Sequence, residues 1–485
     1  MDHSRAPVLD ALAALRRRGD RTFEPPGHRQ GAGVDPRVLD VLGTGTFAAD
    51  ESGLNAVDDR RKSRGTVGEA EALLADAVGA DRAFFMTAGS STSIKSAVLA
   101  VAAPGEQLVV ARNSHKSVMA ALVLGGIHPV WMRPRRDAER HLAHPPGAAE
   151  AARALDEHPD ARGVLLVTPT DYGACADVAE VARECHARDR PLIVDEAWGA
   201  HLPFHPELPP CGMQDGADVA VISVHKMGGG LGQASAIHLQ GDRVDPSVMA
   251  QRTDLLDTTS PSSLVHASID GWRRQMVEQG VELLGAVLDL GREVRALVDA
   301  TPGLHVLDRE LVGPDLAAAF DPFTVVVDVG ELGINGFQAM EWLASERRVR
   351  VALGDHRHVA VKLAVGDDAD GVAHLVAALR DLTTAAGRLP RLPGVQQPSP
   401  GEFDLELAQL PRDALFGPAE QVPARRAVGR VAAEMISPYP PGVPVCLPGE
   451  VLTAAVVEHL TSGIAAGMFV PDAVDPTLET VRVVA

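Results

Sequence analysis

The sequence predicts an α/β protein built on a mostly parallel sheet. Between about residue 66 and residue 300, short apolar runs alternate with Ala-rich stretches of helical character. The apolar runs are bounded as strands buried on both faces of a sheet usually are. The clearest of them cover residues 108–110, 163–167, 191–195 and 219–223. This alternation is typical of a doubly wound or related α/β sheet.

Helices are expected before, between and after these strands. An amphipathic pattern begins near the N-terminus and is broken by Pro25, Pro26 and Gly27. The predicted helices cover residues 7–19, 68–79, 93–103, 115–124, 147–157 and 175–188, with a long helical region over 262–300.

Composition shifts divide the chain into successive parts. Four prolines between Leu389 and Pro400 mark a linker. Before this linker we expect a smaller α+β part with a strand over 323–329 and a helix over 372–384, and after it a tail with helices over 423–435 and 450–463. The predicted domains are an N-terminal arm (1–65), a large domain (66–300), a small α+β domain (301–388), the linker (389–400) and a C-terminal domain (401–485).

Charge and composition exclude several classes of protein. The 45 Lys and Arg against 65 Asp and Glu give a net charge of −20, which argues against nucleic acid or an anionic membrane as a partner. We see no signal peptide and no apolar run near the roughly 20 residues of a membrane helix. The four cysteines show no disulfide or Cys-x-x-Cys spacing. We therefore expect a reduced cytoplasmic protein.

Two polar features follow predicted strands. Residues 87–93 form a hydroxyl-rich turn leading into a helix, where Ser90, Ser91 and Thr92 with free N–H groups suit a phosphate. The alternative, a helix cap with a structural role alone, is favoured when this turn is considered by itself. His115 follows the strand at 108–110, where it either stacks on a ring or caps the next helix.

Two charged residues lie at the ends of later strands. Asp195 ends a buried strand, so its carboxylate must be paired or hydrogen-bonded, or it caps the next turn. Lys226 directly follows the strand at 219–223, where a lysine either forms a Schiff base or begins an exposed loop. Because parallel strands end at one edge of a sheet, these features together predict a pyridoxal phosphate site.

Other motifs are assigned no ligand. Glycines over 228–232 lack the last glycine of a dinucleotide motif, since Gln233 stands there. His201 and His205 have helical spacing for a metal, but Pro203 between them favours a loop, and no metal site is predicted. The Asp355-His-Arg-His segment is predicted to be a surface turn.

The motifs resemble those of the Orn/Lys/Arg decarboxylases, which have the aspartate aminotransferase-like fold of fold type I pyridoxal phosphate enzymes. The segments that carry the resemblance are Pro26-Gly-His-Arg, Thr87-Ala-Gly-Ser-Ser-Thr-Ser-Ile-Lys, Arg112-Asn-Ser-His-Lys-Ser, Val194-Asp-Glu-Ala-Trp-Gly-Ala-His, Ser223-Val-His-Lys, Thr258-Thr-Ser-Pro-Ser and Pro438-Tyr-Pro-Pro-Gly-Val-Pro-Val-Cys-Leu-Pro-Gly-Glu. The resemblance is to the short form of the family, without an N-terminal wing domain. It implies a large domain with a mostly parallel sheet, a small α+β domain and a C-terminal α/β domain.

The resemblance also implies a role for each matching residue. Lys226 would form the aldimine with pyridoxal 5'-phosphate and later donate a proton, Asp195 would pair with the ring nitrogen, and His115 and Ala197 would pack on opposite ring faces. The implied phosphate-binding residues are Gly89, Ser90, Ser91, Thr92, Ser223 and His225, with Thr259 or Ser260 reaching in from a second subunit. A homodimer or larger homo-oligomer is therefore expected.

The implied reaction is decarboxylation of arginine, lysine or ornithine. An aminotransferase or another transformation at Cα stays open as an alternative, because the same residues serve those reactions. A non-catalytic cofactor-binding regulator is the third alternative. The chain departs from the family in Thr170-Asp-Tyr-Gly, where Thr-Tyr-x-Gly is usual, and in Ala88 and Ile94, where the family has amides. These changes bear on the substrate pocket.

Overall fold

The computed structural model describes residues 1–51 and 65–485, and it divides into two compact units. Unit 1 comprises Met1–Val101 and Pro191–Gly285, and unit 2 comprises Ala102–Arg190 and Ala286–Ala485. The long helix α11 (Ser263–Asp299) begins in unit 1 and ends in unit 2. Residues 52–64 of the predicted N-terminal arm lie outside the described residues. The predicted domain boundaries stay a prediction.

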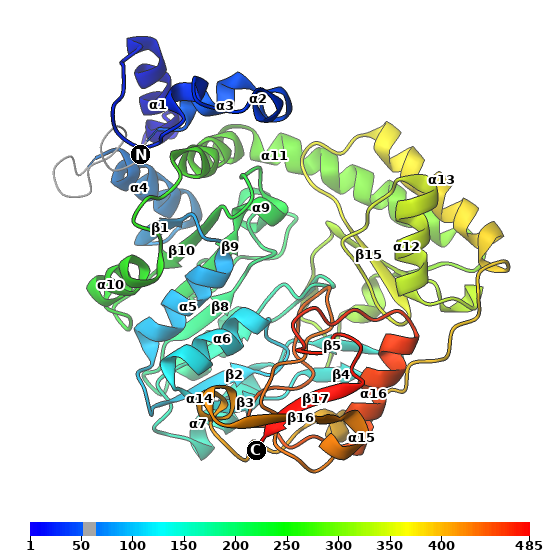
Figure 1. Ribbon diagram of the computed structural model, residues 1–485. Coiled ribbons are helices and arrows are strands. Elements are labelled where there is room, and N and C mark those ends of the chain that lie inside the picture. The colour runs from blue at the N-terminus through cyan, green and yellow to red at the C-terminus, as the bar shows by residue number, and fades with distance from the viewer. Residues whose placement is uncertain (52–64) are drawn as a thin grey trace. The chain divides into compact units, whose positions relative to one another are not determined.

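Unit 1 contains four neighbouring strands in the order β1-β10-β9-β8 (Figure 1). Their bounds are β1 (Arg82–Met86), β10 (Ser235–Leu239), β9 (Val219–Ser223) and β8 (Leu192–Asp195). Strands β8 and β9 are parallel, whereas β10 runs antiparallel to both of its neighbours. Every residue of β8, β9 and β10 is buried, which is why the apolar runs are continuous instead of alternating.

The helices of unit 1 begin at sequence signals of the expected kind. At the start of α10, the Asp245 carboxylate accepts a hydrogen bond from Ser247 N at 2.7 Å, and Pro246 occupies the first helical position. The helices besides α11 are α1 (Pro7–Arg18), α2 (Pro36–Leu42), α3 (Thr44–Ala49), α4 (Thr66–Val78), α5 (Ser90–Val101), α9 (Val224–Met227) and α10 (Pro246–Leu256).

A buried ion pair ties the N-terminal segment to α11. Arg273 Nη2 donates to Asp270 Oδ1 at 2.9 Å, and both side chains are fully buried. The same carboxylate accepts from Val8 N at 2.9 Å, and Arg273 Nη1 donates to the His3 carbonyl at 2.9 Å. A buried pair offsets its desolvation cost only when further hydrogen bonds support it, and these backbone partners supply such support, while Arg273 Nε has no hydrogen-bond partner.

Unit 2 contains three parallel strands in the order β6-β2-β3. Their bounds are β6 (Val164–Val167), β2 (Gln107–Ala111) and β3 (His128–Met132). Helices α6 (Lys116–Gly125), α7 (Ala148–Glu157) and α8 (Val178–His186) connect or follow them. Short antiparallel pairs join β4 (Arg135–Asp137) to β5 (Leu142–His144) and β7 (Ala174–Cys175) to β12 (Ala319–Phe320).

Unit 2 also contains an antiparallel four-stranded sheet in the order β11-β13-β15-β14. Helices α12 (Gly336–Arg347) and α13 (Ala369–Ala386) pack beside it in Figure 1. The strand bounds are β11 (His305–Leu307), β13 (Thr324–Asp328), β14 (Leu353–Gly354) and β15 (His358–Lys362). This sheet and its helices form the small α+β part that the sequence predicts.

The C-terminal part of unit 2 pairs β16 (Ala419–Pro423) with β17 (Thr480–Val484). Their buried residues share a core with α15 (Ala424–Ala427) and α16 (Ala454–Ala465), and α14 (Pro411–Phe416) precedes them. The prediction of a helix over 423–435 is wrong. Gly429 has φ +79°, and residues 431 and 432 form β-bridges instead, so the helical stretch ends at Ala427.

The fold class is confirmed. All four of the clearest predicted strands are present as β2, β6, β8 and β9, and the predicted long helix is α11. The antiparallel strand β10 is an addition that the apolar pattern did not reveal. Within the described residues, no helix is both long enough and apolar enough to cross a membrane.

Candidate functional site

The hydroxyl-rich turn lies between β1 and α5. Gly89 has φ +77°, a left-handed conformation that favours glycine, and Ser90 begins the helix. The Ser223 hydroxyl at the end of β9 donates to Ser90 Oγ at 2.5 Å. The structure thus brings together two predicted phosphate-binding hydroxyls that are 133 positions apart in the sequence.

The other hydroxyls of this turn differ in exposure. Ser91 is exposed, whereas Thr92 is buried and its hydroxyl donates to the Ala88 carbonyl at 3.2 Å. Thr92 therefore stabilises the turn itself. Its predicted contact with a phosphate, and that of Ser91, stay predictions.

Asp195 ends β8 and is 3% exposed. Its Oδ1 accepts a hydrogen bond from Ala197 N at 3.2 Å, so the capping role that the sequence left open is present. In the parallel pairing of β8 with β9, Asp195 lies opposite Val221. This register places the carboxylate beside the end of the strand that leads to Lys226.

Lys226 lies in the short helix α9, directly after β9, and it is half-buried. Its Nζ lies 4.3 Å from the centroid of the Trp198 ring. The interpretation of Lys226 as the start of an exposed loop is therefore wrong. The neighbouring His225 contacts the Ala234 carbonyl through Nδ1 at 3.0 Å, which fixes the orientation of its ring.

The glycines after Lys226 are explained by packing. A Cβ on Gly228 would lie 2.7 Å from the Val224 carbonyl oxygen and 2.8 Å from Nε1 of Trp272. A Cβ on Gly230 would lie 2.7 Å from Cβ of Ala234. These close approaches account for the glycine-rich segment without a dinucleotide.

Glu196 was missed by the sequence analysis. It is 2% exposed, and its Oε1 accepts a hydrogen bond from Gly212 N at 2.8 Å. Burial, together with the negative charges of Asp215 and Asp195, raises the pKa of Glu196 to about 8, against the lowering effect of the Gly212 hydrogen bond. A neutral acid thus stands directly after Asp195, and no local pattern distinguishes it from an ordinary surface glutamate.

Thr259 and Ser260 lie exposed in the segment between α10 and α11. Ser260 N donates to Thr258 Oγ1 at 3.2 Å, which shapes a local turn. Their exposure is compatible with a contact to a second subunit, which stays a prediction.

His115 belongs to unit 2, where it caps α6. Its Nδ1 accepts from Ser117 N at 3.2 Å and lies 2.9 Å from Ser117 Oγ. Lys116 N donates to the Gly442 carbonyl at 3.0 Å, so the Pro-rich segment over 438–445 packs against this helix start. The capping alternative is confirmed, and stacking on a cofactor ring stays a prediction.

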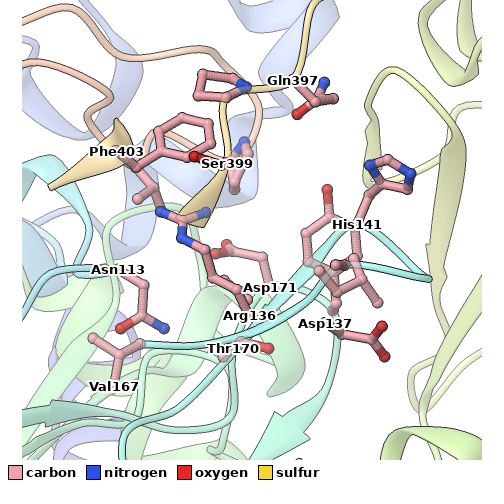
Figure 2. A pocket seen from close by; sticks show the side chains of 17 residues that line it. Asn113, Arg136, Asp137, His141, Val167, Thr170, Asp171, Gln397, Ser399 and Phe403 are labelled. Atoms are coloured by element: carbon pink, nitrogen blue, oxygen red, sulfur yellow. The ribbon is translucent and has the colours of Figure 1, made fainter. Parts of the chain in front are cut away.

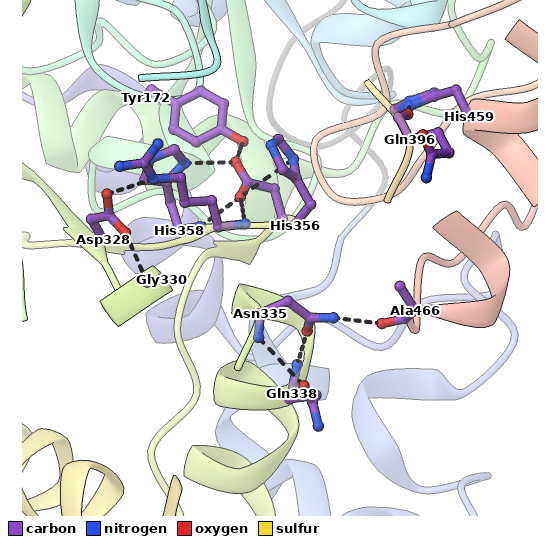
Figure 3. Close-up of polar contacts among 12 residues, drawn as sticks. Tyr172, Asp328, Gly330, Asn335, Gln338, His356, His358, Gln396, His459 and Ala466 are labelled. Atoms are coloured by element: carbon purple, nitrogen blue, oxygen red, sulfur yellow. Dashed lines mark hydrogen bonds and ion pairs between the residues drawn. The ribbon is translucent and has the colours of Figure 1, made fainter. Parts of the chain in front are cut away.

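A hydrogen-bonded cluster surrounds Asp355 between β14 and β15 (Figure 3). The Tyr172 hydroxyl donates to Asp355 Oδ2 at 2.5 Å, and Arg357 N and His358 N donate to Oδ1 at 2.7 and 2.6 Å. Burial raises the pKa of Asp355, but the charge and side-chain hydrogen bond of His358, the charge of His356 and the Tyr172 hydrogen bond hold this pKa well below its usual range. The prediction of a surface turn is wrong, because this segment folds inward onto Tyr172.

Unit 2 also contains a cavity of about 390 Å³ (Figure 2). Asn113, just after β2, and Val167, at the end of β6, both line it, as do Thr170, Asp171 and Tyr172. The cavity therefore lies at the carboxyl ends of two parallel strands, which is where open α/β sheets bind ligands.

Comparison with known proteins finds two family models that match the chain. Residues 6–323 match "Orn/Lys/Arg decarboxylase, major domain", and residues 404–471 match "Orn/Lys/Arg decarboxylase, C-terminal domain". The chain is 35% identical to an arginine decarboxylase of Bacillus anthracis, over 99% of this chain and 97% of that protein. It is 34% identical to an arginine decarboxylase of Bacillus subtilis, over 100% and 99%.

More distant matches include lysine decarboxylases. The constitutive lysine decarboxylase of Escherichia coli is 26% identical over 93% of this chain and 76% of that protein. Among solved structures, lysine decarboxylase A from Pseudomonas aeruginosa has a TM-score of 0.81 at 21% identity, covering 99% of this chain and 80% of that one. At this identity, the structural likeness establishes the fold alone.

Proposed function

The chain belongs to the Orn/Lys/Arg decarboxylase family, and from this premise we propose that it is a pyridoxal phosphate-dependent decarboxylase of a basic amino acid, namely arginine, lysine or ornithine. The observation that carries the proposal is the pairing of β8 with β9. It sets the buried Asp195 beside the strand that leads to Lys226.

The residues of unit 1 fit pyridoxal phosphate. A phosphate needs hydrogen-bond donors, and the start of α5 with the Ser90 and Ser223 hydroxyls supplies them. A pyridinium nitrogen needs a carboxylate, and Asp195 is a buried one. A carbonyl needs an amine to condense with, and Lys226 offers one beside Trp198. When bound, the cofactor supplies the electron sink for cleavage at Cα.

Each residue then has a defined task. By the family resemblance, Asp195 would keep a proton on the ring nitrogen, and Lys226 would hold the cofactor and later supply a proton to the product. Gly89, Ser90, Ser91, Thr92, Ser223 and His225 would hold the phosphate, with Thr259 or Ser260 of a second subunit. His115 and Ala197 would contact the ring.

The proposal is tested by incubating the holoenzyme anaerobically with each of the twenty amino acids and identifying the products by mass spectrometry. We expect carbon dioxide and the corresponding amine from one or more basic amino acids. A keto acid in place of an amine would establish an aminotransferase instead. No product with any amino acid would favour the non-catalytic, cofactor-binding alternative.

A further inference from the structure

Two pairs of serines link helix α5 to the strands of unit 1. The first is the bond from the Ser223 hydroxyl to Ser90 Oγ, and the second joins the hydroxyls of Ser93 and Ser235 at 2.6 Å. Ser90 and Ser93 are three residues apart on the helix, so they lie on the same face. Ser223 and Ser235 lie directly opposite each other in the antiparallel pairing of β9 with β10. The two links are therefore neighbours.

The two links differ in burial. Ser90 is half-buried at the start of α5, whereas Ser93 and Ser235 are both 0% exposed. Buried hydroxyls need a hydrogen-bond partner, and in the second link each serine supplies it to the other. A ligand that approaches the start of the helix does not reach these two hydroxyls. Their bond therefore acts on the position of α5.

The start of β10 holds the hydroxyl-rich turn at two further points. Ser235 pairs with Met86, the last residue of β1 before the turn. Gly89 N, within the turn, donates to the Gln233 carbonyl at 2.9 Å. Gln233 has φ +77°, which is uncommon for a residue other than glycine. Backbone and side-chain bonds together thus fix the turn and the first residues of α5 before any ligand arrives.

We propose that the buried Ser93–Ser235 pair is a positioning pair for the phosphate of the cofactor, because it holds the start of α5 and its donors in a fixed arrangement. This inference rests on the proposed function, which assigns the start of α5 to that phosphate. All of the residues in the argument belong to unit 1. A site whose donors are already in place loses less binding free energy to ordering them.

The test compares pyridoxal 5'-phosphate with pyridoxal, which lacks the phosphate. Both are titrated calorimetrically into full-length protein from which the cofactor has been removed. Ser93→Ala and Ser235→Ala should each weaken pyridoxal 5'-phosphate about 3- to 10-fold, as expected when one or two side chains become ordered only on binding. The affinity for pyridoxal should not change. The double variant should lose no more than either single variant, because each removes the same bond.

Ser96→Ala is the matched control. It removes another fully buried hydroxyl of α5, which donates to the Thr92 carbonyl at 3.0 Å, and it should bind both compounds as the wild type does. Should a single variant fail to fold, the double variant leaves neither hydroxyl unpaired and carries the same test. Equal losses for the two compounds, or an unchanged affinity for pyridoxal 5'-phosphate, would overturn the inference.

The outcomes also separate this inference from the proposed function. If the phosphate-specific loss occurs while the wild type decarboxylates nothing, the proposed reaction fails and the positioning role stands. If the wild type decarboxylates a basic amino acid while the variants keep its full preference for pyridoxal 5'-phosphate, the inference alone fails. A wild type that binds both compounds equally would overturn the phosphate assignment and the inference together.

Discussion

The ammonium of Lys226 lies over the indole ring of Trp198, with Nζ 4.3 Å from the ring centroid. Both residues follow strand ends, Lys226 after β9 and Trp198 after β8, and the two strands are parallel neighbours. A cation over an aromatic face is stabilised by about 0.5–2 kcal/mol. This contact holds the amine against the segment that directly follows β8.

The first prediction concerns the residue that holds the cofactor. Borohydride reduction of the purified yellow protein should attach pyridoxal phosphate covalently to Lys226, and peptide mapping by mass spectrometry identifies the adduct. Lys226→Ala should lose turnover and keep some cofactor, because the phosphate contacts remain. Lys95 and Lys116 are the internal comparison, and an adduct on either would contradict the assignment.

The second prediction concerns Asp195. Asp195→Asn should keep the fold and much of the cofactor, because the amide retains an oxygen for the Ala197 N–H. Turnover should fall by roughly two to three orders of magnitude, because a neutral amide does not keep the ring nitrogen protonated and such a bond is worth a few kcal/mol. Steady-state kinetics and the cofactor absorbance measure the two effects separately. Turnover near that of the wild type would refute the role.

The third prediction is a pH dependence of stability caused by Glu196. Its pKa is raised from 4.5 to about 8, so between these values the folded protein binds one proton more than the unfolded chain. Stability therefore falls as pH rises through this window, by at most about 1.4 kcal/mol per pH unit. Glu196→Gln keeps an acceptor for Gly212 N and should remove this fall.

Chemical denaturation between pH 5.5 and 8.5 measures the difference. Wild type and Glu196→Gln should diverge as pH rises, with the variant becoming relatively more stable. Glu157→Gln changes the charge of an exposed residue equally and should follow the wild type. Parallel curves for Glu196→Gln and the wild type would show that Glu196 is ionised in the fold at neutral pH.

The local sequence pattern was sufficient to predict a buried strand and the polar residue at or just after its end. The buried runs of β8 and β9 predicted strands, and the rule for parallel sheets brought Asp195 and Lys226 to one edge, as the Asp195–Val221 pairing bears out. The helix predicted over 423–435 failed, because Gly429 and the bridges of Val431 and Ala432 overrode its helical pattern.

Contacts between residues far apart in the chain could not be predicted from the sequence pattern. Asp355 was predicted to lie at the surface, yet its partner Tyr172 is 183 positions away. The raised pKa of Glu196 likewise depends on the burial of its carboxyl group, which the neighbouring sequence does not predict. Polar clusters assembled by distant segments carry no periodic signal, so only the fold reveals them.

The last prediction concerns assembly, and it begins from the exposed segment between α10 and α11. Thr259 and Ser260 are exposed in the single chain. The family resemblance implies that one of them contacts the phosphate bound in a second subunit. The protein should therefore sediment as a homodimer or larger assembly at assay concentration.

Mixing inactive Lys226→Ala protein with an inactive double variant, Thr259→Ala with Ser260→Ala, should restore activity after subunit exchange. Each mixed dimer then has one site with both Lys226 and the hydroxyls intact. The same mixture made from two Lys226→Ala samples is the control and should stay inactive. A fully active monomer, or mixed dimers without activity, would show that each chain completes its own site.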